Sequence, residues 1–481
     1  MSSSPSLEDR LYGCWFGKSI GGTLGLPVEG RTERLSLTYY DPVPEVAPPN
    51  DDLELQLVWL DLVERSCGRL AAADFGAAWL RHIHYMWDEY GRCRWNLRRG
   101  VPLEGIGVFE NPFHSGMGSP IRSELWACLF PGDPESAAYY ASLDSTLDHG
   151  REGIAGEVFC SVVQSLAAVG IPIPDALHEA LIKLPPGTET ARAISLVLAG
   201  WKHGIDPWVC RDLLLKSHDN ENFTHSPLNV ALVAWALAYG NGDFERSILL
   251  CVNAGYDTDS TGATVGATLG LHLGASAIPA RWKEPIGNGV YLGPGILGLD
   301  GAPRTLGELT ERQGAAVGKL GQKRWADVLW IDSAWGPGFD LTKLPGTIML
   351  QPHGNGPAVP WANGELPAAV KAAGGATWLW SKDDDLARFF VVLAREGAAL
   401  SIDGKRVVSC PEGLPYVPAT HRCPKEAVAR EIFSSATHEV RLNLRSRNAA
   451  QEACVILTGA NLHLAPWTKA DLPEPAKLPE I

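Results

Sequence analysis

The feature that most constrains the fold is a change of hydrophobic periodicity near residue 320. From about Leu7 to Pro285, apolar residues recur at three-to-four spacing, with Gly or Pro at the segment ends, which is typical of helices. Beyond about Trp325, short β-branched or aromatic segments are separated by turn residues. We therefore expect an all-α domain over residues 1–320 and a smaller β-rich, sandwich-like domain over residues 321–481.

Length and charge limit the functional classes. A chain of 481 residues is too long for one ordinary core, which favours more than one domain. The net charge of −14 supplies no basic excess to neutralise phosphates, so we expect no nucleic-acid partner. The N-terminus lacks the order of a signal peptide and no long apolar run occurs, so we expect a cytoplasmic protein without a membrane partner. The 10 cysteines form no CxxC pair, which argues against a zinc site.

One short segment, NAGYDTDSTGATVG, concentrates carboxylates and hydroxyls at the start of a predicted helix. Asp257 and Asp259 lie two residues apart and Ser260 follows, with glycines on both sides that permit a tight backbone. The residues that follow are small enough to pack closely against neighbouring helices. Such a segment can point several oxygen atoms at one spot.

A second acidic cluster lies in PNDDLELQLVWL, where Asn50, Asp51 and Asp52 immediately precede an apolar helical run. One interpretation is a helix cap with acidic first-turn residues, which the helix dipole favours. Two such clusters hold more carboxylates than capping requires, and a divalent cation relieves the repulsion between adjacent carboxylates. Oxygen ligands without nearby Cys or paired His indicate a hard ion, Mg²⁺, Mn²⁺ or Ca²⁺.

A third acid, Glu29, follows a Gly-rich turn at the end of the first predicted helix. At these three places the sequence resembles the ADP-ribosylglycohydrolase family. GGTLGLPVEG is similar to the family's Gly-rich turn, NDDLE to its Thr-Asp-Asp motif, and NAGYDTDSTGATVGATLG to its Asp-x-Asp-Thr motif. Two segments between them, 116–157 and 225–248, resemble family segments in the same order. The resemblance covers about Leu7 to Pro285 and does not extend to the C-terminal third.

The resemblance implies an all-helical domain whose acidic clusters converge on two divalent ions, Mg²⁺ or Mn²⁺. The metal ligands that it implies are Asn50, Asp51, Asp52, Asp257, Asp259 and Ser260. Asn50 stands where the family usually has Thr, so that a side-chain amide oxygen replaces a hydroxyl there.

The resemblance also suggests catalytic and substrate-binding residues. As catalytic residues we expect Asp51 or Asp52 to position or activate water, and Glu29 to contact substrate or to assist proton transfer. His149 matches a recurrent family His, and either substrate contact or the orientation of a helix end would explain it. Many members have Asn where this chain has Met117, and Ser119 or Arg122 are candidates to remake that substrate contact.

The expected function is divalent-metal-dependent hydrolysis of an N- or O-glycosidic bond at the anomeric carbon of a ribose-like sugar. The substrate would be an ADP-ribosyl group on a protein or a related small glycoside. The alternative is a catalytically inactive, metal-dependent protein that binds ADP-ribose or a sugar. A helical scaffold without a ligand would have no use for both acidic clusters. The exact sugar and the oligomeric state stay open.

Two features of the C-terminal third have alternative interpretations. Trp378 and Trp380 alternate in TWLWSK, so they share one face of a strand. Exposed rings there would stack on sugars, whereas buried rings would belong to the sandwich core or to an interface with the helical domain. The acidic run from Asp383 to Asp385 is either a solvated turn or a Ca²⁺ site.

Overall fold

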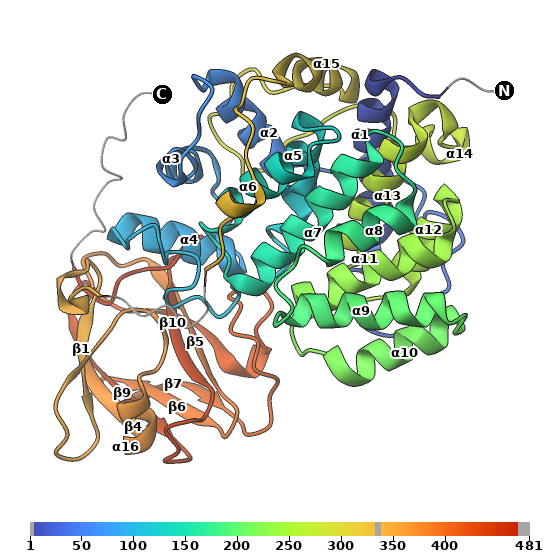
Figure 1. Cartoon of the computed structure of the whole chain (residues 1–481). Helices are drawn as coiled ribbons and strands as arrows, with labels where there is room; N and C mark the ends of the chain where they lie inside the picture. The colour runs from blue at the N-terminus through green and yellow to red at the C-terminus, as the bar shows by residue number, and fades with distance from the viewer. Residues whose placement is uncertain (1–3, 332–337, 470–481) are drawn as a thin grey trace. The chain divides into compact units, whose positions relative to one another are not determined.

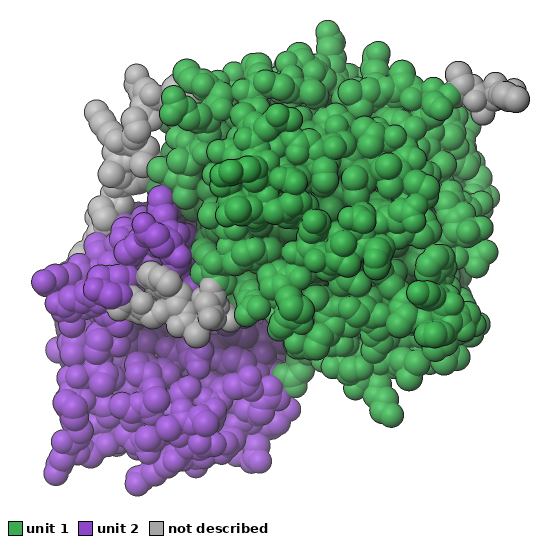
Figure 2. All heavy atoms as spheres, in the orientation of Figure 1, with its two compact units in different colours: residues 1–84, 114–333, 479–481 green, residues 85–113, 334–478 purple. Residues whose placement is uncertain are grey.

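The chain forms two compact units. A computed structural model describes residues 4–331 and 338–469 (Figure 1). Among the described residues, unit 1 comprises 4–84 and 114–331, and unit 2 comprises 85–113 and 338–469 (Figure 2). Residues 85–113 therefore belong with the β-rich unit, whereas the sequence analysis included them in a helical domain over 1–320. Periodicity identifies this segment as helical, but it does not identify what the helix packs against.

Unit 1 is helical, as the 3.6-residue periodicity predicts. Its α-helices are α1 (Leu7–Gly25), α2 (Asp51–Arg65), α3 (Ala72–His82), α5 (Ser123–Leu129), α6 (Pro134–Ser145), α7 (Arg151–Ala167), α8 (Ile173–Leu181), α9 (Glu189–Lys202), α10 (Pro207–His218), α11 (Ser226–Gly240), α12 (Phe244–Asn253), α13 (Thr258–Leu273), α14 (Ala280–Lys283) and α15 (Leu306–Ala316). Short 3₁₀ turns are η1 (Leu26–Val28), η2 (Pro120–Arg122), η3 (Ala275–Ala277) and η4 (Trp325–Asp327). Within the described residues, no helix combines the length and apolar character that crossing a membrane requires.

Helices α1 and α13 pack antiparallel through a ladder of glycines, which brings their backbones into contact. The rungs are Gly13 with Gly270, Gly17 with Gly266, and Gly21 with Gly262. A Cβ atom added to Gly17 would lie 1.9 Å from the carbonyl oxygen of Gly266, so no larger side chain fits at this rung. Because both series of glycines recur every four residues, they lie along one face of each helix. The small residues predicted to allow close packing therefore do so along most of both helices.

Unit 2 contains two antiparallel sheets. Its strands are β1 (Ile348–Pro352), β2 (Val359–Trp361), β3 (Gly364–Glu365), β4 (Gly375–Ser381), β5 (Ala387–Ala394), β6 (Ala398–Ile402), β7 (Lys405–Cys410), β8 (Val428–Ile432), β9 (Thr437–Leu444) and β10 (Ala453–Thr458). One sheet has the strand order β2-β1-β4-β9-β6-β7, and the other has the order β3-β10-β5-β8. Unit 2 also contains α4 (Asp88–Arg99), α16 (Ala368–Ala373), η5 (Leu341–Lys343) and η6 (Lys425–Ala427).

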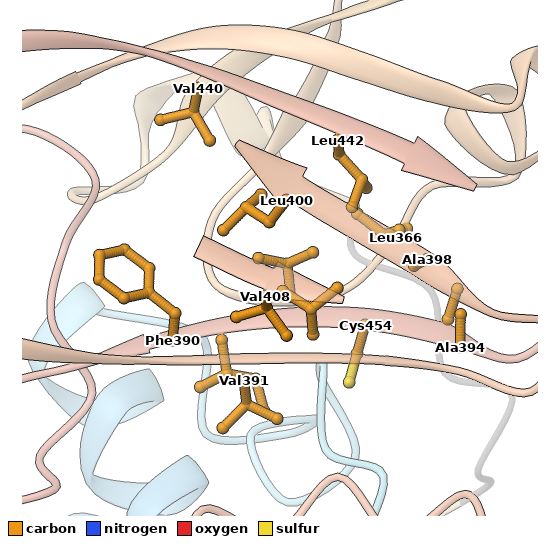
Figure 3. Close-up of a cluster of buried hydrophobic side chains, with 14 of the residues drawn as sticks. Leu366, Phe390, Val391, Ala394, Ala398, Leu400, Val408, Val440, Leu442 and Cys454 are labelled. Atoms are coloured by element: carbon orange, nitrogen blue, oxygen red, sulfur yellow. The ribbon is translucent and has the colours of Figure 1, made fainter. Parts of the chain in front are cut away.

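Apolar side chains from both sheets form one core, which confirms the expected sandwich-like packing. Strand β9 alternates strictly between exposed and buried residues, so that Val440 and Leu442 face inward. Figure 3 shows these side chains with Leu400 of the same sheet and Phe390 of the other sheet. Strand β10 is buried at every position, as expected for a strand covered on both faces.

The two open questions about the C-terminal third are resolved by burial and pairing. Trp378 and Trp380 are 4% and 1% exposed and pack around Trp467, so they belong to the sandwich core. In the acidic run, Asp384 forms ion pairs with Lys382 and Arg388. The tryptophan rings are therefore not available to stack on a sugar, and Asp384 is already paired with cations of the chain.

Helix α4 is an integral part of unit 2. Trp95 packs with Ala362 and Leu464, and the Arg92 guanidinium donates to the carbonyl oxygen of Asn363. The Asn363 side chain in turn donates to the carbonyl oxygen of Leu457 in β10, over 2.7 Å. These contacts account for the grouping of residues 85–113 with strands that lie more than two hundred residues later in the chain.

Candidate metal centre

The glycine ladder ends at the acidic residues. At Gly25, the last residue of α1, an added Cβ would lie 2.2 Å from the carbonyl oxygen of Thr258 at the start of α13. The 3₁₀ turn η1 then leads directly to Glu29, and Asp257 is the N-cap residue of α13. Antiparallel packing thus places the C-terminal end of α1 beside the N-terminal end of α13.

Backbone hydrogen bonds join the Glu29 turn to the Asp257 turn. The amide of Gly30 donates to the carbonyl of Tyr256 over 2.9 Å, and the amide of Tyr256 donates to the carbonyl of Arg31 over 2.7 Å. Gly255 has a φ of +79°, and a Cβ there would lie 2.5 Å from the Arg31 carbonyl oxygen. This turn therefore requires glycine both for its conformation and for the close approach.

Three carboxylates meet where the two turns join. Glu29, Asp257 and Asp259 each offer an oxygen, and these oxygens all lie within 4.8 Å of one another. Asp257 and Asp259 are 3% and 5% exposed, whereas Glu29 is exposed to solvent. Over residues 4–331 and 338–469, this is the one group of three or more acidic, His or Cys side chains with metal-like spacing.

The second acidic cluster joins the first through Asn50. Its amide nitrogen donates to Asp259 Oδ2 over 3.2 Å, and its amide oxygen caps α2 by accepting from the backbone N–H of Asp52 over 2.7 Å. The two segments predicted to converge therefore do so, although they lie some two hundred residues apart. Ligation of a metal by the Asn50 oxygen stays a prediction, since that oxygen is used here as a helix cap.

Asp52 is buried next to a lysine. It is 2% exposed, and neither of its carboxylate oxygens accepts a hydrogen bond from a described residue. The ammonium of Lys18, in α1, lies 3.9 Å from Asp52 Oδ1. Lys18, Asn50 and Asp52 line one pocket of about 20 Å³. Asp51, the first residue of α2, is more exposed than Asp52.

Lys18 belongs to a buried polar network. Its ammonium donates to Glu124 Oε2 over 3.1 Å and to the Ile121 carbonyl over 3.0 Å. Gln56 and Gln164 donate to the two oxygens of Glu124. These bonds satisfy a charged pair that would otherwise be costly to bury, because water contributes nothing at this depth.

Burial and like charge act together on the aspartates. Burial raises the pKa of Asp257 well above its usual range, and the neighbouring charges of Asp259 and Glu29 add to this effect. Burial also raises the pKa of Asp259 and of Asp52, although Lys18 opposes the shift at Asp52. Ser260 moderates the pKa of Asp257 through a side-chain hydrogen bond. Carboxylates held in this way favour any cation that can bind them.

These residues fit a divalent cation with oxygen ligands. Asp259 Oδ1 is buried and accepts no hydrogen bond from the described part of the chain, so it is available as a ligand. Glu29, Asp257 and Asp259 would hold the ion, and the donor set contains no sulfur or imidazole. Ser260 and Asp52 also act on the pKa of Asp257: a hydrogen bond from Ser260 lowers it and the charge of Asp52 raises it.

Arg122 lies in a separate buried network, fully paired with carboxylates. Its guanidinium donates to both oxygens of Asp148, over 2.8 and 2.9 Å, and to Asp144 Oδ2 over 3.1 Å. It also donates to the Gly118 carbonyl over 2.7 Å and is 0% exposed. Substrate contact by Arg122 would require some of these bonds to break, so that role stays a prediction.

Two further substrate candidates lie in the same network. His149 is fully buried, with its Nδ1 atom 2.8 Å from Asp148 Oδ1. Burial alone would raise the pKa of Asp148, but Arg122 and His149 lower it to about 2. Ser119 is also fully buried; its hydroxyl donates to the Gly153 carbonyl and accepts from Ser145. Hydrogen bonds and ion pairs thus connect Arg122 and His149 through Asp148.

Sequence reasoning missed three residues that hold the centre together. Arg211 donates to the carbonyls of Ala254 and Thr32, and so ties both turns to α10. Asn229 accepts from the backbone N–H of Asp257 over 3.2 Å. The third is Lys18, which could have been noticed as a charged residue within an apolar helical run. The sequence does not indicate, however, which carboxylate it pairs with.

Comparison with known proteins supports the family resemblance. An uncharacterized protein from Archaeoglobus fulgidus is 24% identical over 308 residues, which is 60% of this chain and 94% of that protein. A solved structure described as an ADP-ribosylglycohydrolase-related protein complex is 21% identical and covers 65% of this chain and 97% of its own, with a TM-score of 0.42. The sequence profile of the ADP-ribosylglycohydrolase family matches residues 3–316, well over half of the chain. The chain therefore belongs to the ADP-ribosylglycohydrolase family.

Proposed function

We propose that this protein is a divalent-metal-dependent glycohydrolase that cleaves an N- or O-glycosidic bond at the anomeric carbon of a ribose-like sugar. The observation that carries the proposal is the convergence of Glu29, Asp257 and Asp259, whose oxygens lie within 4.8 Å of one another. One of these carboxylates is exposed and two are buried, so the centre extends from solvent to the protein interior. Family membership supports glycosidic-bond hydrolysis as the reaction.

The exposed and buried acids suit different tasks. Glu29 lies in a turn that solvent can reach, so it can accept a hydrogen bond from a sugar hydroxyl or take up a proton from water. Asp51, the half-buried first residue of α2, would orient a water molecule near Asp52. Asn229 and Arg211 hold the turn that carries Asp257. Their hydrogen bonds fix the position of its carboxylate relative to Glu29.

Oxygen-only ligands favour Mg²⁺ or Mn²⁺ as the bound ion. When bound, such an ion polarises oxygen atoms and makes a coordinated water more acidic. The residues that would hold it are Glu29, Asp257 and Asp259. The chain's own contribution is then to orient vicinal sugar hydroxyls and to place a carboxylate beside the anomeric carbon, where positive charge develops as the bond breaks.

The substrate class that fits is an ADP-ribosyl group or a related small riboside. The test is release of reducing sugar from ADP-ribosylated peptides, ADP-ribose, nucleosides, pentosides and hexosides, each with Mg²⁺, Mn²⁺ or EDTA. We expect turnover of at least one riboside that EDTA removes and that added metal restores. Asp259→Ala should abolish it, while Asp340→Ala, which changes an exposed carboxylate of unit 2, should not.

Two outcomes would contradict the proposal. Turnover that is insensitive to EDTA and to Asp259→Ala would exclude this centre as the active site. Metal and ADP-ribose binding without cleavage of any member of the panel would instead indicate a catalytically inactive binding protein. Calorimetry with ADP-ribose in the presence of Mn²⁺ separates that second outcome from a protein that binds no sugar.

A further inference from the structure

Lys18 brings a positive charge to the α2 side of the acidic centre. Its ammonium lies 3.0 Å from the Ile121 carbonyl, 3.1 Å from Glu124 Oε2 and 3.9 Å from Asp52 Oδ1. A lysine ammonium has three N–H donors, and the first two contacts use two of them. The third is available to Asp52. The side chains of Lys18 and Asp52 are 1% and 3% exposed, so water screens this pair very little.

The Asp257 side of the centre has a different charge balance. The charges that act on Asp257 come from Asp259, Glu29 and Asp52, and all of them are negative. In the described ranges, no lysine or arginine forms an ion pair with Asp257 or Asp259. Protonation of a carboxylate or a cation from solution must therefore balance this side.

The two sides are too close to be charged independently. Asn50 bridges them by donating to Asp259, and it lines the same pocket as Lys18 and Asp52. A divalent ion ligated by Asp52 would share that carboxylate with the Lys18 ammonium, and two cations on one buried carboxylate repel each other. An ion ligated by Glu29, Asp257 and Asp259 meets negative charge instead.

We propose that the Lys18 ammonium takes the place of one metal ion, so that the protein binds a single divalent cation through Glu29, Asp257 and Asp259. Lys18 is then a positioning residue that neutralises and orients Asp52. This differs from the two ions that the family resemblance implies. The inference rests on the proposed function only in taking this centre to be the metal site.

The test is the number of Mn²⁺ ions bound per full-length chain, measured by calorimetry and by electron paramagnetic resonance. The informative variant is K18Q/E124Q, which removes the ammonium together with its buried counter-charge and leaves two neutral hydrogen-bonding side chains. The matched control is E124Q, which keeps Lys18. We expect one ion in the wild type and in E124Q, and two magnetically coupled ions in K18Q/E124Q.

Two bound ions in the wild type, or a single ion in a folded K18Q/E124Q protein, would overturn the inference. Circular dichroism establishes folding of each variant, and K18M/E124Q provides an apolar replacement if the first double variant does not fold. The wild-type stoichiometry decides the question if neither variant folds. One bound ion without glycoside cleavage would contradict the proposed function alone, whereas two bound ions with cleavage would contradict this inference alone.

Discussion

Unit 1 contains two clusters of buried charge that are built in opposite ways. Around Arg122, opposite charges are paired, because its guanidinium forms charged hydrogen bonds to Asp144 and Asp148. Around Asp257 and Asp259, carboxylate faces carboxylate, and burial raises the pKa of both. The first cluster contains its own cation, whereas no described lysine or arginine forms an ion pair with Asp257 or Asp259. The number of buried acids therefore does not identify a binding site; the lack of an internal counter-charge does.

The largest effect should come from breaking the paired cluster. Arg122→Met leaves Asp144 and Asp148 buried without their cation, and removing one partner of a buried ion pair costs about 3–5 kcal/mol. We expect a loss of this size in the free energy of unfolding, measured by urea denaturation. Asp61→Asn, which changes a surface pair with Arg65, is the control and should cost less than about 1 kcal/mol. Equal effects of the two substitutions would show that the buried Arg122 ion pairs stabilise the fold no more than a surface pair does.

The second prediction concerns a substitution that should displace the Asp257 and Asp259 cluster without changing its charges. In Gly17→Ala the new Cβ would lie 1.9 Å from the Gly266 carbonyl oxygen, so α1 and α13 must separate. Overpacking of this kind costs about 1–3 kcal/mol, and contact with backbone places this site near the upper end. Mn²⁺ affinity should fall as well, because Glu29 follows the C-terminal end of α1 whereas Asp257 caps the N-terminal end of α13.

Gly314→Ala in α15 is the matched control for this substitution. An added Cβ there meets nothing within 4 Å, so the variant should be neutral or up to about 1 kcal/mol more stable. Calorimetry and urea denaturation check both variants. If Gly17→Ala kept wild-type stability and metal affinity, the ladder would not position the acidic centre.

The third prediction removes a charge from the unpaired cluster. Asp259→Asn should weaken Mn²⁺ binding by more than about 100-fold, since even the loss of a group that only supports a metal ligand costs about 10–100-fold. In EDTA it should not lower the free energy of unfolding, because the substitution relieves repulsion with Asp257. Asp148→Asn in the paired cluster should behave in the opposite way, destabilising the fold while leaving Mn²⁺ affinity unchanged. Loss of stability in both variants would contradict the comparison.

The smallest effect is a difference in pH dependence between one acid of each cluster, Asp148 and Asp257. The pKa of Asp148 is lowered to about 2, so it contributes stability above its unfolded pKa, about 2 kcal/mol, which is lost as the pH falls from about 4 to about 2. The pKa of Asp257 is raised, so in EDTA its ionisation lowers stability as the pH rises above its unfolded value.

Urea denaturation of the metal-free protein as a function of pH measures both contributions. Asp257→Asn should flatten the decline at higher pH, and Asp148→Asn should flatten the loss in acid. Saturating Mn²⁺ should also flatten the decline at higher pH, because it binds the ionised carboxylates. A decline unchanged by Asp257→Asn would show that other groups cause it.

Much of the site was predictable because its acids lie in short segments with clear local signals. Asp257 and Asp259 follow a glycine turn, and Asn50 precedes an apolar helical run, so local spacing indicates where each oxygen cluster begins. The small residues that follow Asp259 likewise predicted close helix packing. The change of period near residue 320 correctly predicted helices before sheets.

Partnership between distant residues was not predictable in the same way. Arg122 was a candidate for substrate contact, and only the fold shows that Asp144 and Asp148 use its donors. Helix α4 has helical periodicity, but its contacts with Ala362 and Leu464 assign it to unit 2. The pairing of Arg122 and the packing of α4 both depend on which surfaces come into contact. Hydrophobic periodicity and composition do not specify these contacts.

The glycine ladder also dictates when the centre can form during synthesis. Helix α1 has no partner for its glycine face until α13 has been made, and the two helices are separated by residues 26–257. At about 5–20 residues per second, α1 waits roughly 10–50 s on the ribosome for α13. During that interval Glu29 has no neighbouring Asp257 or Asp259, so metal capture must follow, rather than guide, the docking of the first helix.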